Sequence, residues 1–462
     1  MVRRRAIDTA TTALSDANGW RTLPILLIAA ALAVASPRLG CQAPSSTAYF
    51  AAPTGLATND GTREQPWDLQ TALANRSAVV QPGDTIWLAG GRYVGDFRSM
   101  LHGTAEQPIV VRPSPSARAT IEGRLNAYGA FTVFRDFEVT QSRAGTRRQR
   151  GIDVRGPGHR FINLVVHDAG SSGIGFWMEG SDAEVYGCLV YHNGTASSLD
   201  HGIYAINREG RKTIADNIVF DNFAYGIHVY GVVGQAIRQV TIDGNIAFGN
   251  GSISPHDRTK SNLLVGGDGI PADDIVISHN LFFYDTTART PNVRLGYDPK
   301  IENGDLAMHD NVIIGGKPPV ALLRWRSVKT AHNRIDGVDD AQIAGSFVPP
   351  RARLARLAST PIATPVVFVR ANRYEPGRAN VAVIFPAGRT TARIPVAGLL
   401  RPGEKYVIRR AEDFFGAPAA SGVYAGGDLQ VVRIAASLSA DTAPKRDPSS
   451  PFLEAFVLQR VP

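Results

Sequence analysis

The sequence predicts an all-β protein: a right-handed single-stranded parallel β-helix over residues 48–345, followed by a small antiparallel β-sandwich over residues 363–462. Two observations predict the first part. Glycine is abundant, with 46 residues, while charged residues make up only 19% of the chain, a balance typical of turn-rich β proteins. A short apolar phrase also recurs every 22 to 35 residues between positions 136 and 333. A period of this size with variable length indicates a solenoid whose loops absorb the insertions.

The recurring phrase is a strand of three to five residues, which is too short for a helical stripe and excludes helical repeats. Equivalent residues of successive coils in a parallel β-helix stack about 4.8 Å apart. We therefore expect Ile218, Ile246, Leu281 and Val312 to form one aliphatic stack. Each phrase begins at an anchor, and the anchors are Asp136, Asn163, Gly187, Asn217, Asn245, Asn280, Asn311 and Asn333.

The recurrent Asn anchors are interpreted as structural. The backbone bends at a corner between two sheets, and its polar groups lose their strand partners there. An inward Asn side chain can bond to these groups and to the Asn of the next coil, so a ladder is predicted. Gly187 interrupts this predicted ladder, and the sequence offers no explanation for the interruption.

A second short strand follows many of the anchors, at residues 174–176, 203–205, 227–229, 263–265 and 293–295. Alternation places the outer two residues of each triplet inside the solenoid and the middle residue outside. The middle residues are Gly175, Tyr204, His228, Leu264 and Arg294. One exterior face is therefore expected to display Tyr, His and Arg side chains from neighbouring coils.

The first 35 residues are interpreted as an export signal or an uncleaved membrane anchor. Arginines at positions 3–5 precede a fourteen-residue apolar stretch, residues 23–36, and a spanning helix needs about 20 residues. Residues 33–35 offer a small-x-small cleavage site, and residues 36–47 would form a linker. The protein is expected to be secreted or periplasmic, with membrane contact only through an uncleaved N-terminal segment.

The chain carries a formal charge of +8. Its basic residues are scattered, which argues against nucleic acid and favours an acidic polysaccharide as the partner of a monomeric protein. The two cysteines are Cys41 and Cys188. Because Cys188 occupies an apolar position of the repeat, a buried thiol without a catalytic role is predicted.

The character of the sequence changes after about residue 350. Prolines punctuate a linker over residues 346–362. Short alternating strands at regular spacing then predict the antiparallel sandwich, at residues 366–369, 380–385, 391–396, 404–409 and 452–458. This part resembles the β-domains appended to many secreted carbohydrate-active enzymes. Residues 413–416 could form an exposed sugar platform, but packing in a core or turn is favoured.

The segment that precedes the repeat carries a family resemblance. Its phrases at residues 49–55, 61–62, 66–67, 82–88 and 90–93 resemble the opening of secreted pectate-lyase-like β-helix proteins. The resemblance spans residues 48–340 and implies that residues 67–76 form a helix that caps the open end of the solenoid. This superfamily holds lyases, epimerases, hydrolases and inactive binding modules, so the fold leaves the function open.

A second resemblance concerns the candidate site. His201-Gly202-Ile203, followed by Arg208-Glu209, resembles a segment of bacterial mannuronan C5-epimerases. Residues 255–258 (PHDR) resemble their Asp-Pro-His-Asp motif, except that Ser254 replaces the leading Asp and the order of the two motifs differs. The candidate catalytic residues are His201, Tyr204 and His228, and the candidate substrate-binding residues are Asp200, Arg208, Tyr230, His256, Arg258 and Arg294.

These residue types suit chemistry on a uronate sugar. Removal of the C5 proton, which is α to the carboxylate, needs a cation on the carboxylate, a base and a proton donor. Arg294 or Arg208 could supply the cation, His201 or His228 the base, and Tyr204 the proton. The sequence thus predicts β-elimination or C5-epimerisation of a uronate-containing polysaccharide.

Two alternatives stay open: a non-catalytic polysaccharide-binding or surface protein, and a glycoside hydrolase. A hydrolase needs paired carboxylates, which Asp200, Asp221 and Asp257 could supply, but the signatures of β-helix polygalacturonases are missing. No cofactor is expected. Ca²⁺ could bind through Asp243, Asp257 or Asp268, although no dense Asp cluster of the EF-hand kind occurs.

Overall fold

The computed structural model describes residues 46–141, 149–195, 199–254, 260–285, 288, 290–336, 362–433 and 451–461. Regular structure in these residues is β apart from one short α-helix, which confirms the all-β class. No helix within them is long and apolar enough to cross a membrane. The predicted leader, residues 1–35, and most of both predicted linkers lie outside the described residues.

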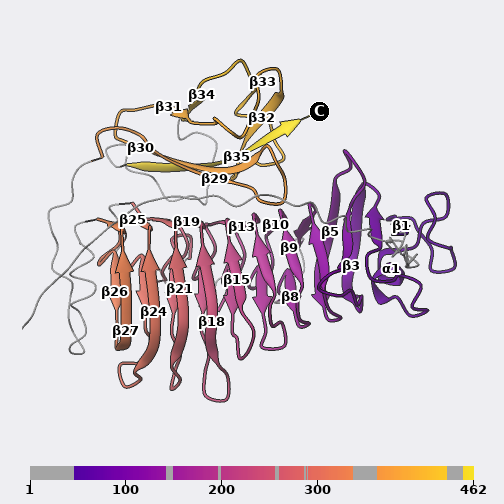
Figure 1. Ribbon diagram of the computed structural model, residues 1–462, viewed down its shortest axis with the longest axis horizontal. Helices are drawn as coiled ribbons and strands as arrows, with labels where there is room; N and C mark the ends of the chain where they lie inside the picture. The colour runs from indigo at the N-terminus through magenta and orange to yellow at the C-terminus, as the bar shows by residue number, and fades with distance from the viewer. Residues whose placement is uncertain are drawn as a thin grey trace, which may run out of the picture. The chain divides into compact units, whose positions relative to one another are not determined.

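The first part of the chain is a parallel β-helix, as predicted (Figure 1). Within the described residues, one strand of each coil joins an eleven-stranded parallel sheet. Its strands, in spatial order, are β1 (Ala48–Ala51), β2 (Thr85–Leu88), β4 (Ile109–Pro113), β6 (Thr132–Arg135), β9 (Arg160–Ile162), β12 (Glu184–Tyr186), β15 (Lys212–Ala215), β18 (Ile237–Asp243), β21 (Ala272–Ser278), β24 (Asn303–His309) and β27 (Trp325–Ala331).

Most coils also contribute two short strands. The first short strands are β7 (Glu138–Thr140), β10 (Val165–His167), β13 (Leu189–Tyr191), β16 (Ile218–Phe220), β19 (Ile246–Phe248), β22 (Leu281–Phe283), β25 (Val312–Ile314) and β28 (Arg334–Ile335). The second short strands are β8 (Ile152–Val154), β11 (Ile174–Phe176), β14 (Ile203–Ala205), β17 (Ile227–Val229), β20 (Leu263–Val265), β23 (Val293–Leu295) and β26 (Val320–Leu322). The long strands β3 (Gly91–Ser99) and β5 (Ala119–Ala127) pair with each other and precede both sets of short strands. One part of β5 pairs with β7, the first of the first short strands, and another part pairs with β8, the first of the second short strands.

The helix expected near the N-terminal end of the solenoid is α1 (Leu69–Ala74). Asp68 caps it, because its carboxylate accepts a hydrogen bond from the Thr71 backbone N–H at 2.9 Å, a common way to satisfy the first helical turn. Leu69, Ala72 and Leu73 are buried in the core of the β-helix. The helix therefore covers apolar residues of the first coils.

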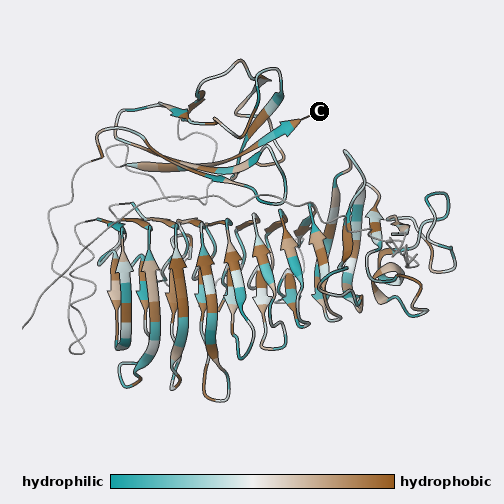
Figure 2. Ribbon diagram, in the orientation of Figure 1, coloured by the Kyte–Doolittle hydropathy of each residue, from teal (hydrophilic) through white to brown (hydrophobic). Residues whose placement is uncertain are grey.

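The interior of the β-helix is apolar, and apolar segments recur from strand to strand (Figure 2). The outer residues of the second short strands, such as Ile203 and Ala205, are fully buried, as the alternation predicts. Cys188 is a fully buried free thiol. Burial raises its pKa to about 12, so the thiol stays protonated, in agreement with the predicted structural role.

The predicted aliphatic stack exists but points out of the β-helix. Ile218, Ile246, Leu281 and Val312 are in register on β16, β19, β22 and β25. They pack in a cluster separate from the interior core, and this cluster includes residues of the C-terminal β-domain. The sequence pattern alone could not identify the face, because a covered exterior face is as apolar as the interior.

The predicted Asn ladder is confirmed over five rungs. The side-chain N–H of each Asn donates to the side-chain oxygen of the Asn on the next coil. The rungs are Asn217, Asn245, Asn280, Asn311 and Asn333, and the four successive distances are 2.9, 3.0, 2.9 and 2.8 Å. Each backbone N–H donates to the same oxygens. The ladder therefore satisfies corner groups that strand pairing leaves unpaired.

Asn163 and Gly187 are not rungs, which corrects the alignment of the repeat. The strand register places Leu164 and Cys188 in the ladder column, one residue later. Asn163 and Gly187 instead occupy the preceding corner position, with φ of 56° and 66°. Asn, Asp and Gly tolerate this left-handed conformation best, which explains why Gly187 is found there.

A second Asn ladder, which sequence reasoning missed, runs along the corner before the second short strands. Asn193, Asn222, Asn250, Asn262 and Asn292 are linked by side-chain hydrogen bonds of 3.0, 2.8, 2.8 and 2.8 Å in succession. All five are buried. This ladder fixes the corner that leads into the strands of the candidate site.

The C-terminal β-domain is an antiparallel sandwich, as predicted. Its larger sheet has the order β29 (Val366–Ala371), β30 (Arg378–Phe385), β35 (Phe452–Val461), β32 (Lys405–Arg410) and β33 (Ala420–Val423). Its smaller sheet pairs β31 (Thr391–Ile394) with β34 (Leu429–Val432). Residues such as Val383, Ile394 and Phe456 pack between the sheets. The sequence missed β33 and β34.

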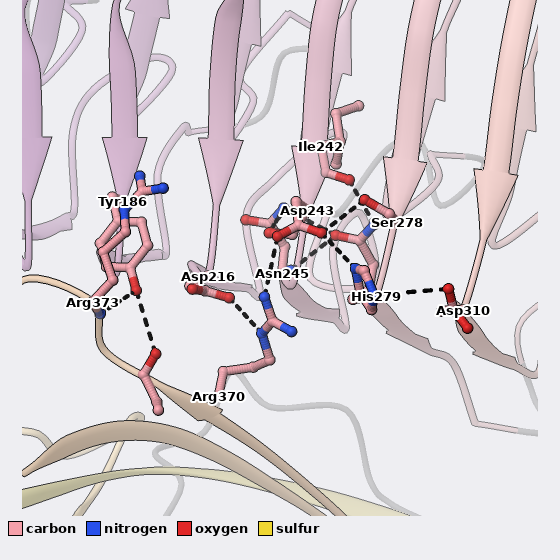
Figure 3. A network of polar contacts seen from close by, with 12 residues as sticks. Tyr186, Asp216, Ile242, Asp243, Asn245, Ser278, His279, Asp310, Arg370 and Arg373 are labelled. Carbon is pink, nitrogen blue, oxygen red and sulfur yellow. Dashed lines mark hydrogen bonds and ion pairs between the residues drawn. The ribbon is translucent and has the colours of Figure 1, made fainter. Parts of the chain in front are cut away.

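The C-terminal β-domain covers the exterior face of the first short strands. Ala382, Ile384 and Leu453 belong to the same buried cluster as the outward residues of β13, β16, β19 and β22. Arg370 adds a hydrogen bond of 2.6 Å to Asp216 at the corner (Figure 3). Phe414 packs against this cluster, which supports a packing role for residues 413–416.

Candidate functional site

The candidate site lies on the second-strand face, which we define as the outward residues of β8, β11, β14, β17, β20 and β23 with the residues that flank these strands. The middle residues are in register, as predicted: Gly175, Tyr204, His228, Leu264 and Arg294 follow one another on successive coils. Tyr204 and His228 are therefore neighbours, and Arg294 lies two coils beyond His228, or roughly 10 Å along the axis.

The centre of this face is a pair of histidines. Nδ1 of His228 and Nε2 of His201 are 2.9 Å apart and share a hydrogen bond, and the two ring centroids are 4.1 Å apart. The ring of Tyr204 lies 6.0 Å from His201 and 5.8 Å from His228. The structure thus brings together the three side chains predicted to be catalytic.

The expectation that the exterior face displays His228 to solvent is wrong, and His201 beside it is buried as well. His201 is 3% exposed and His228 is 5% exposed, whereas Tyr204 is partly exposed. Tyr225 and Tyr230 cover His228 from two sides, with ring centroids 4.4 and 4.8 Å away and nearly parallel planes. Large aromatic neighbours on an exterior strand face can bury an outward residue, an effect that alternation alone does not predict.

The surroundings keep His228 neutral. Burial lowers the pKa of its imidazole well below the ordinary value of 6.5, and the nearby His201, Lys260 and Arg294 lower it further. A neutral imidazole can accept a proton. His228 therefore has the protonation state of a general base at neutral pH and in mild acid.

Tyr204 has the opposite character. Burial raises the pKa of its phenol above 10.0, and Arg150 only partly offsets this effect. The edge of its ring meets Trp177 at a centroid distance of 5.7 Å. The hydroxyl group therefore stays protonated at neutral pH and can act as a proton donor.

Basic and aromatic residues extend the face on the N-terminal side of Tyr204. The guanidinium carbons of Arg150 and Arg155 lie 4.7 and 4.9 Å from the centre of the Trp177 ring. Trp177 donates a hydrogen bond of 2.6 Å to the buried Asp153. A Cβ atom on Gly175 would lie 2.9 Å from the Cδ of Arg150, so the glycine leaves room for the arginine to cross the strand.

A similar arrangement lies on the C-terminal side of His228. The Arg294 guanidinium carbon lies 4.9 Å from the centre of the Tyr297 ring, and Tyr297 meets Tyr230 edge-on at 5.0 Å. The Lys260 ammonium lies 5.4 Å from the centre of the Tyr225 ring. Cations on both sides of the histidines suit a polyanionic ligand.

Two other predicted site residues, Asp200 and Arg208, are not part of this group. Asp200 is fully buried, and its carboxylate accepts hydrogen bonds from the Ser171 hydroxyl at 3.2 Å and the Thr195 backbone N–H at 3.1 Å. Both carboxylate oxygens thus accept hydrogen bonds from within the protein, which indicates a structural role in place of the predicted substrate contact. Arg208 is exposed and donates to the Gly234 carbonyl at 3.4 Å, in the turn after β17. His256 and Arg258 lie outside the described residues.

Sequence reasoning missed Arg150, Trp177, Tyr225, Lys260 and Tyr297. The repeat itself contained a signal for two of them. Arg150, His201 and Tyr225 each precede the second short strand by two residues, and the register places them in one column. Extending the aligned repeat by two residues would have predicted that Tyr225 follows His201 on the next coil.

Two of the acidic residues considered for Ca²⁺, Asp243 and Asp268, do not converge. Asp243 ends β18, whereas Asp268 precedes β21 and pairs by a backbone bridge with Val232, at the other end of these long strands. Asp257 lies outside the described residues. Oxygen ligands for Ca²⁺ must surround one point, so Asp243 and Asp268 do not fit a shared Ca²⁺ site.

A separate cleft of about 500 Å³ lies near the N-terminal first short strands. Its charged groups pair with one another: Glu138 accepts hydrogen bonds from Arg118 at 2.9 Å and from Thr120 at 2.5 Å, and contacts His167 at 2.9 Å. Burial would raise the pKa of Glu138, but these partners hold it at about 2. Because the charged groups of this cleft already pair with one another, we assign the cleft a structural role. The His201–His228 pair is the better candidate for a functional site.

The fold and the second-strand face together define a right-handed parallel β-helix protein with an aromatic and basic exterior face. Residues 49–311 match the family model described as "Pel9A-like, right handed beta helix region", and the chain belongs to this family. This membership confirms the resemblance to pectate-lyase-like β-helix proteins. No curated protein sequence matches the chain.

Several solved structures are similar to the chain. One is pectate lyase Pel9A, with 19% identity, 66% of this chain and 82% of that chain covered, and a TM-score of 0.46. Another is a rhamnogalacturonan lyase, with 14% identity, coverage of 62% and 87%, and a TM-score of 0.46. A third is an alginate lyase from Paenibacillus sp. str. FPU-7, with 17% identity, coverage of 62% and 99%, and a TM-score of 0.44.

Proposed function

We propose that the protein acts on a uronate-containing polysaccharide and removes the C5 proton of a uronate unit, which leads to β-elimination or to C5-epimerisation. The observation that carries the proposal is the grouping of a neutral His228, its partner His201 and a protonated Tyr204 between Arg150 and Arg294. A base, a proton donor and cations for carboxylates are the groups that this chemistry needs.

Substrate binding follows from the stacking of the coils. Arg150 and Arg294 lie on coils to either side of the Tyr204 and His228 coils. A polyanionic chain along the axis can place successive sugar units over successive coils, with carboxylates near both arginines. Trp177 and the tyrosines offer flat surfaces for the sugar rings.

In the proposed reaction His228 accepts the C5 proton through its neutral imidazole. For β-elimination, the electrons of the C5–H bond form a C4=C5 double bond, the C4–O bond breaks, and Tyr204 gives its proton to the leaving oxygen. For epimerisation, Tyr204 gives its proton to C5 from the opposite face and the C4–O bond stays intact. In either case an arginine stabilises the negative charge that develops on the carboxylate.

The test is incubation of the purified protein with alginate, pectate and glycosaminoglycans. Ultraviolet absorbance of an unsaturated uronate reports elimination, and NMR of the sugar protons reports epimerisation. Tyr204→Phe and His228→Ala should each abolish turnover and leave the circular dichroism spectrum unchanged. Tyr406→Phe, on β32 of the C-terminal β-domain, is the matched control and should keep full activity. Turnover by Tyr204→Phe at the wild-type rate would contradict the assignment.

The proposal also sets a pH dependence. Because the pKa of His228 lies well below 6.5 and that of Tyr204 above 10.0, both groups hold the required protonation state between these limits. We expect similar turnover at pH 6 and pH 8. A loss of most activity between pH 8 and pH 6 would show that the base has an ordinary imidazole pKa.

One observation favours a second candidate, a non-catalytic polysaccharide-binding protein: both histidines are almost fully buried. A binding protein would retain uronan without any product. Arg294→Ala should then weaken binding and its salt dependence, whereas Arg393→Ala, on β31 of the C-terminal β-domain, should not. Product formation by the wild-type protein would exclude this candidate.

We infer export from the charged and apolar pattern of residues 1–35, and with it a secreted or periplasmic location. That the protein is a monomer stays a separate prediction. N-terminal sequencing of protein from an exporting cell should begin after residue 35. A sequence that begins at Met1 or Val2 would indicate an anchored protein instead.

A further inference from the structure

A cluster of histidines and one carboxylate lies at the corner that follows the long strands β21, β24 and β27. His279, Asp310 and His332 occupy the same corner position on three successive coils, with φ of 53°, 56° and 55°. His309 is the last residue of β24 and stands directly before Asp310. Parallel stacking thus brings three imidazoles around one carboxylate, far along the chain from the His201–His228 pair.

The donor atoms of this cluster are close together. The ligand atoms of His279, His309 and Asp310 all lie within 4.8 Å of one another. An Asp310 carboxylate oxygen lies 2.9 Å from Nδ1 of His309 and 3.7 Å from Nε2 of His279, and the other oxygen lies 3.5 Å from Nδ1 of His332. These side chains are well exposed, so an ion can reach them from solvent.

A second carboxylate orients His279. Asp243, at the end of β18, lies 2.8 Å from Nδ1 of His279, and the Ser278 hydroxyl donates to the same carboxylate oxygen at 2.7 Å (Figure 3). Nδ1–H of His279 is thereby held by Asp243, and Nε2 is turned toward Asp310. Histidines that bind metals commonly donate their other ring N–H to a carboxylate in this way.

We propose that His279, His309 and Asp310 bind one divalent transition-metal ion of the Zn²⁺ class, with His332 within reach as a fourth ligand. Two or three imidazoles with one carboxylate form a donor set that suits Zn²⁺. Ca²⁺ and Mg²⁺ prefer oxygen ligands and should bind poorly. Zinc–nitrogen bonds of about 2.0–2.1 Å place tetrahedral ligand atoms roughly 3.4 Å apart. Ligand atoms within 4.8 Å of one another therefore need to close by at most about 1.4 Å, which exposed side chains can do.

The bound ion would link coils near the C-terminal end of the β-helix. Its ligands come from successive coils, and Asp243 also accepts a hydrogen bond of 3.1 Å from Arg370 of the C-terminal β-domain (Figure 3). An ion that binds only the folded protein raises its stability. The site would therefore strengthen both the stacking of these coils and the corner against which the C-terminal β-domain packs.

The experiment uses full-length protein without a histidine tag, treated with a chelator and then titrated with Zn²⁺, Co²⁺ or Ca²⁺. We expect one equivalent of Zn²⁺ to bind and to raise the melting temperature, Co²⁺ to give the visible absorption of a tetrahedral site, and Ca²⁺ to do neither. His279→Gln and His309→Gln should each remove the Co²⁺ absorption and the thermal shift. Asp243→Asn keeps the ligands and should weaken binding roughly 10–100-fold.

His102→Gln, an exposed histidine of the N-terminal coils, is the matched control and should bind like the wild-type protein. Circular dichroism of the metal-free variants checks that each is folded. The proposal is overturned if the wild-type protein binds no stoichiometric Zn²⁺, if Zn²⁺ binds at many weak sites without a thermal shift, or if folded His279→Gln and His309→Gln bind Co²⁺ as the wild-type protein does.

Discussion

Replacing Asn245 by Leu tests how the corner of the β-helix is stabilised. Asn245 is a fully buried rung of the first ladder. Its amide donates to the Ile214 carbonyl at 2.8 Å and to the Asn280 oxygen at 3.0 Å, and its oxygen accepts from the Asn217 backbone N–H at 3.1 Å. Leucine has a similar size but can replace none of these bonds.

The expected cost follows from the groups that lose their partners. Asn245→Leu leaves two backbone groups, the Ile214 carbonyl and the Asn217 N–H, buried without these hydrogen bonds, and it also removes an acceptor of the Asn217 side-chain amide. Each buried polar group without a partner costs about 1–3 kcal/mol, so for the two backbone groups we expect a loss of roughly 2–6 kcal/mol in the free energy of unfolding. Some of this loss is offset because leucine is the more apolar side chain.

The assay is thermal and urea unfolding, combined with amide hydrogen exchange, because a solenoid can open locally. Faster exchange should be concentrated at Asn217 and its neighbours on β16. Asn333→Leu is the matched control: Asn333 is the last and less buried rung, so it should cost less. An Asn245→Leu protein as stable as the wild-type protein, or a larger effect from Asn333→Leu, would refute the reasoning.

Three further predictions concern stability. Burial lowers the pKa of His159 to about 4, so its contribution should be lost as pH falls from 6.5 to 4, and His159→Gln should flatten the acid side of a melting-temperature profile. Burial lowers the pKa of Lys212 from 10.5 to about 7, so between these pH values the unfolded chain binds more protons than the folded protein. The stability of the wild-type protein, relative to that of Lys212→Met, should therefore rise from pH 7 to pH 9. Arg370→Ala removes the ion-pair partner of Asp216. Because Arg370 is a quarter exposed, we expect a cost of about 1–3 kcal/mol in the free energy of unfolding, below that of a fully buried pair. Proteolysis of the C-terminal β-domain should become faster, and an unchanged rate would show that the apolar contacts alone hold this domain in place.

The period of the repeat was sufficient to predict the coils, the register of the second short strands and the first Asn ladder. The chain's own pattern could not distinguish an anchor from the corner position before it, because Asn suits both positions. Asn163 and Gly187 were misplaced for that reason, and the φ values of these residues resolve the alignment.

Burial on the exterior was the part that sequence could not predict. Ile218 faces outward but lies under the C-terminal β-domain, a contact between residues that are far apart in the chain. His228 faces outward but is covered by Tyr225 and Tyr230. Alternation gives the direction of a side chain, whereas its exposure depends on neighbours that the repeat does not specify.

The most direct test of the proposed function follows the C5 proton itself. Proton NMR of alginate, pectate or a glycosaminoglycan in heavy water detects loss of the C5–H signal, whether the outcome is elimination or epimerisation. We predict that the wild-type protein removes this signal in at least one uronan and that folded His228→Ala does not. Unchanged C5–H signals in all three uronans with wild-type protein, or equal loss with His228→Ala, would contradict the account.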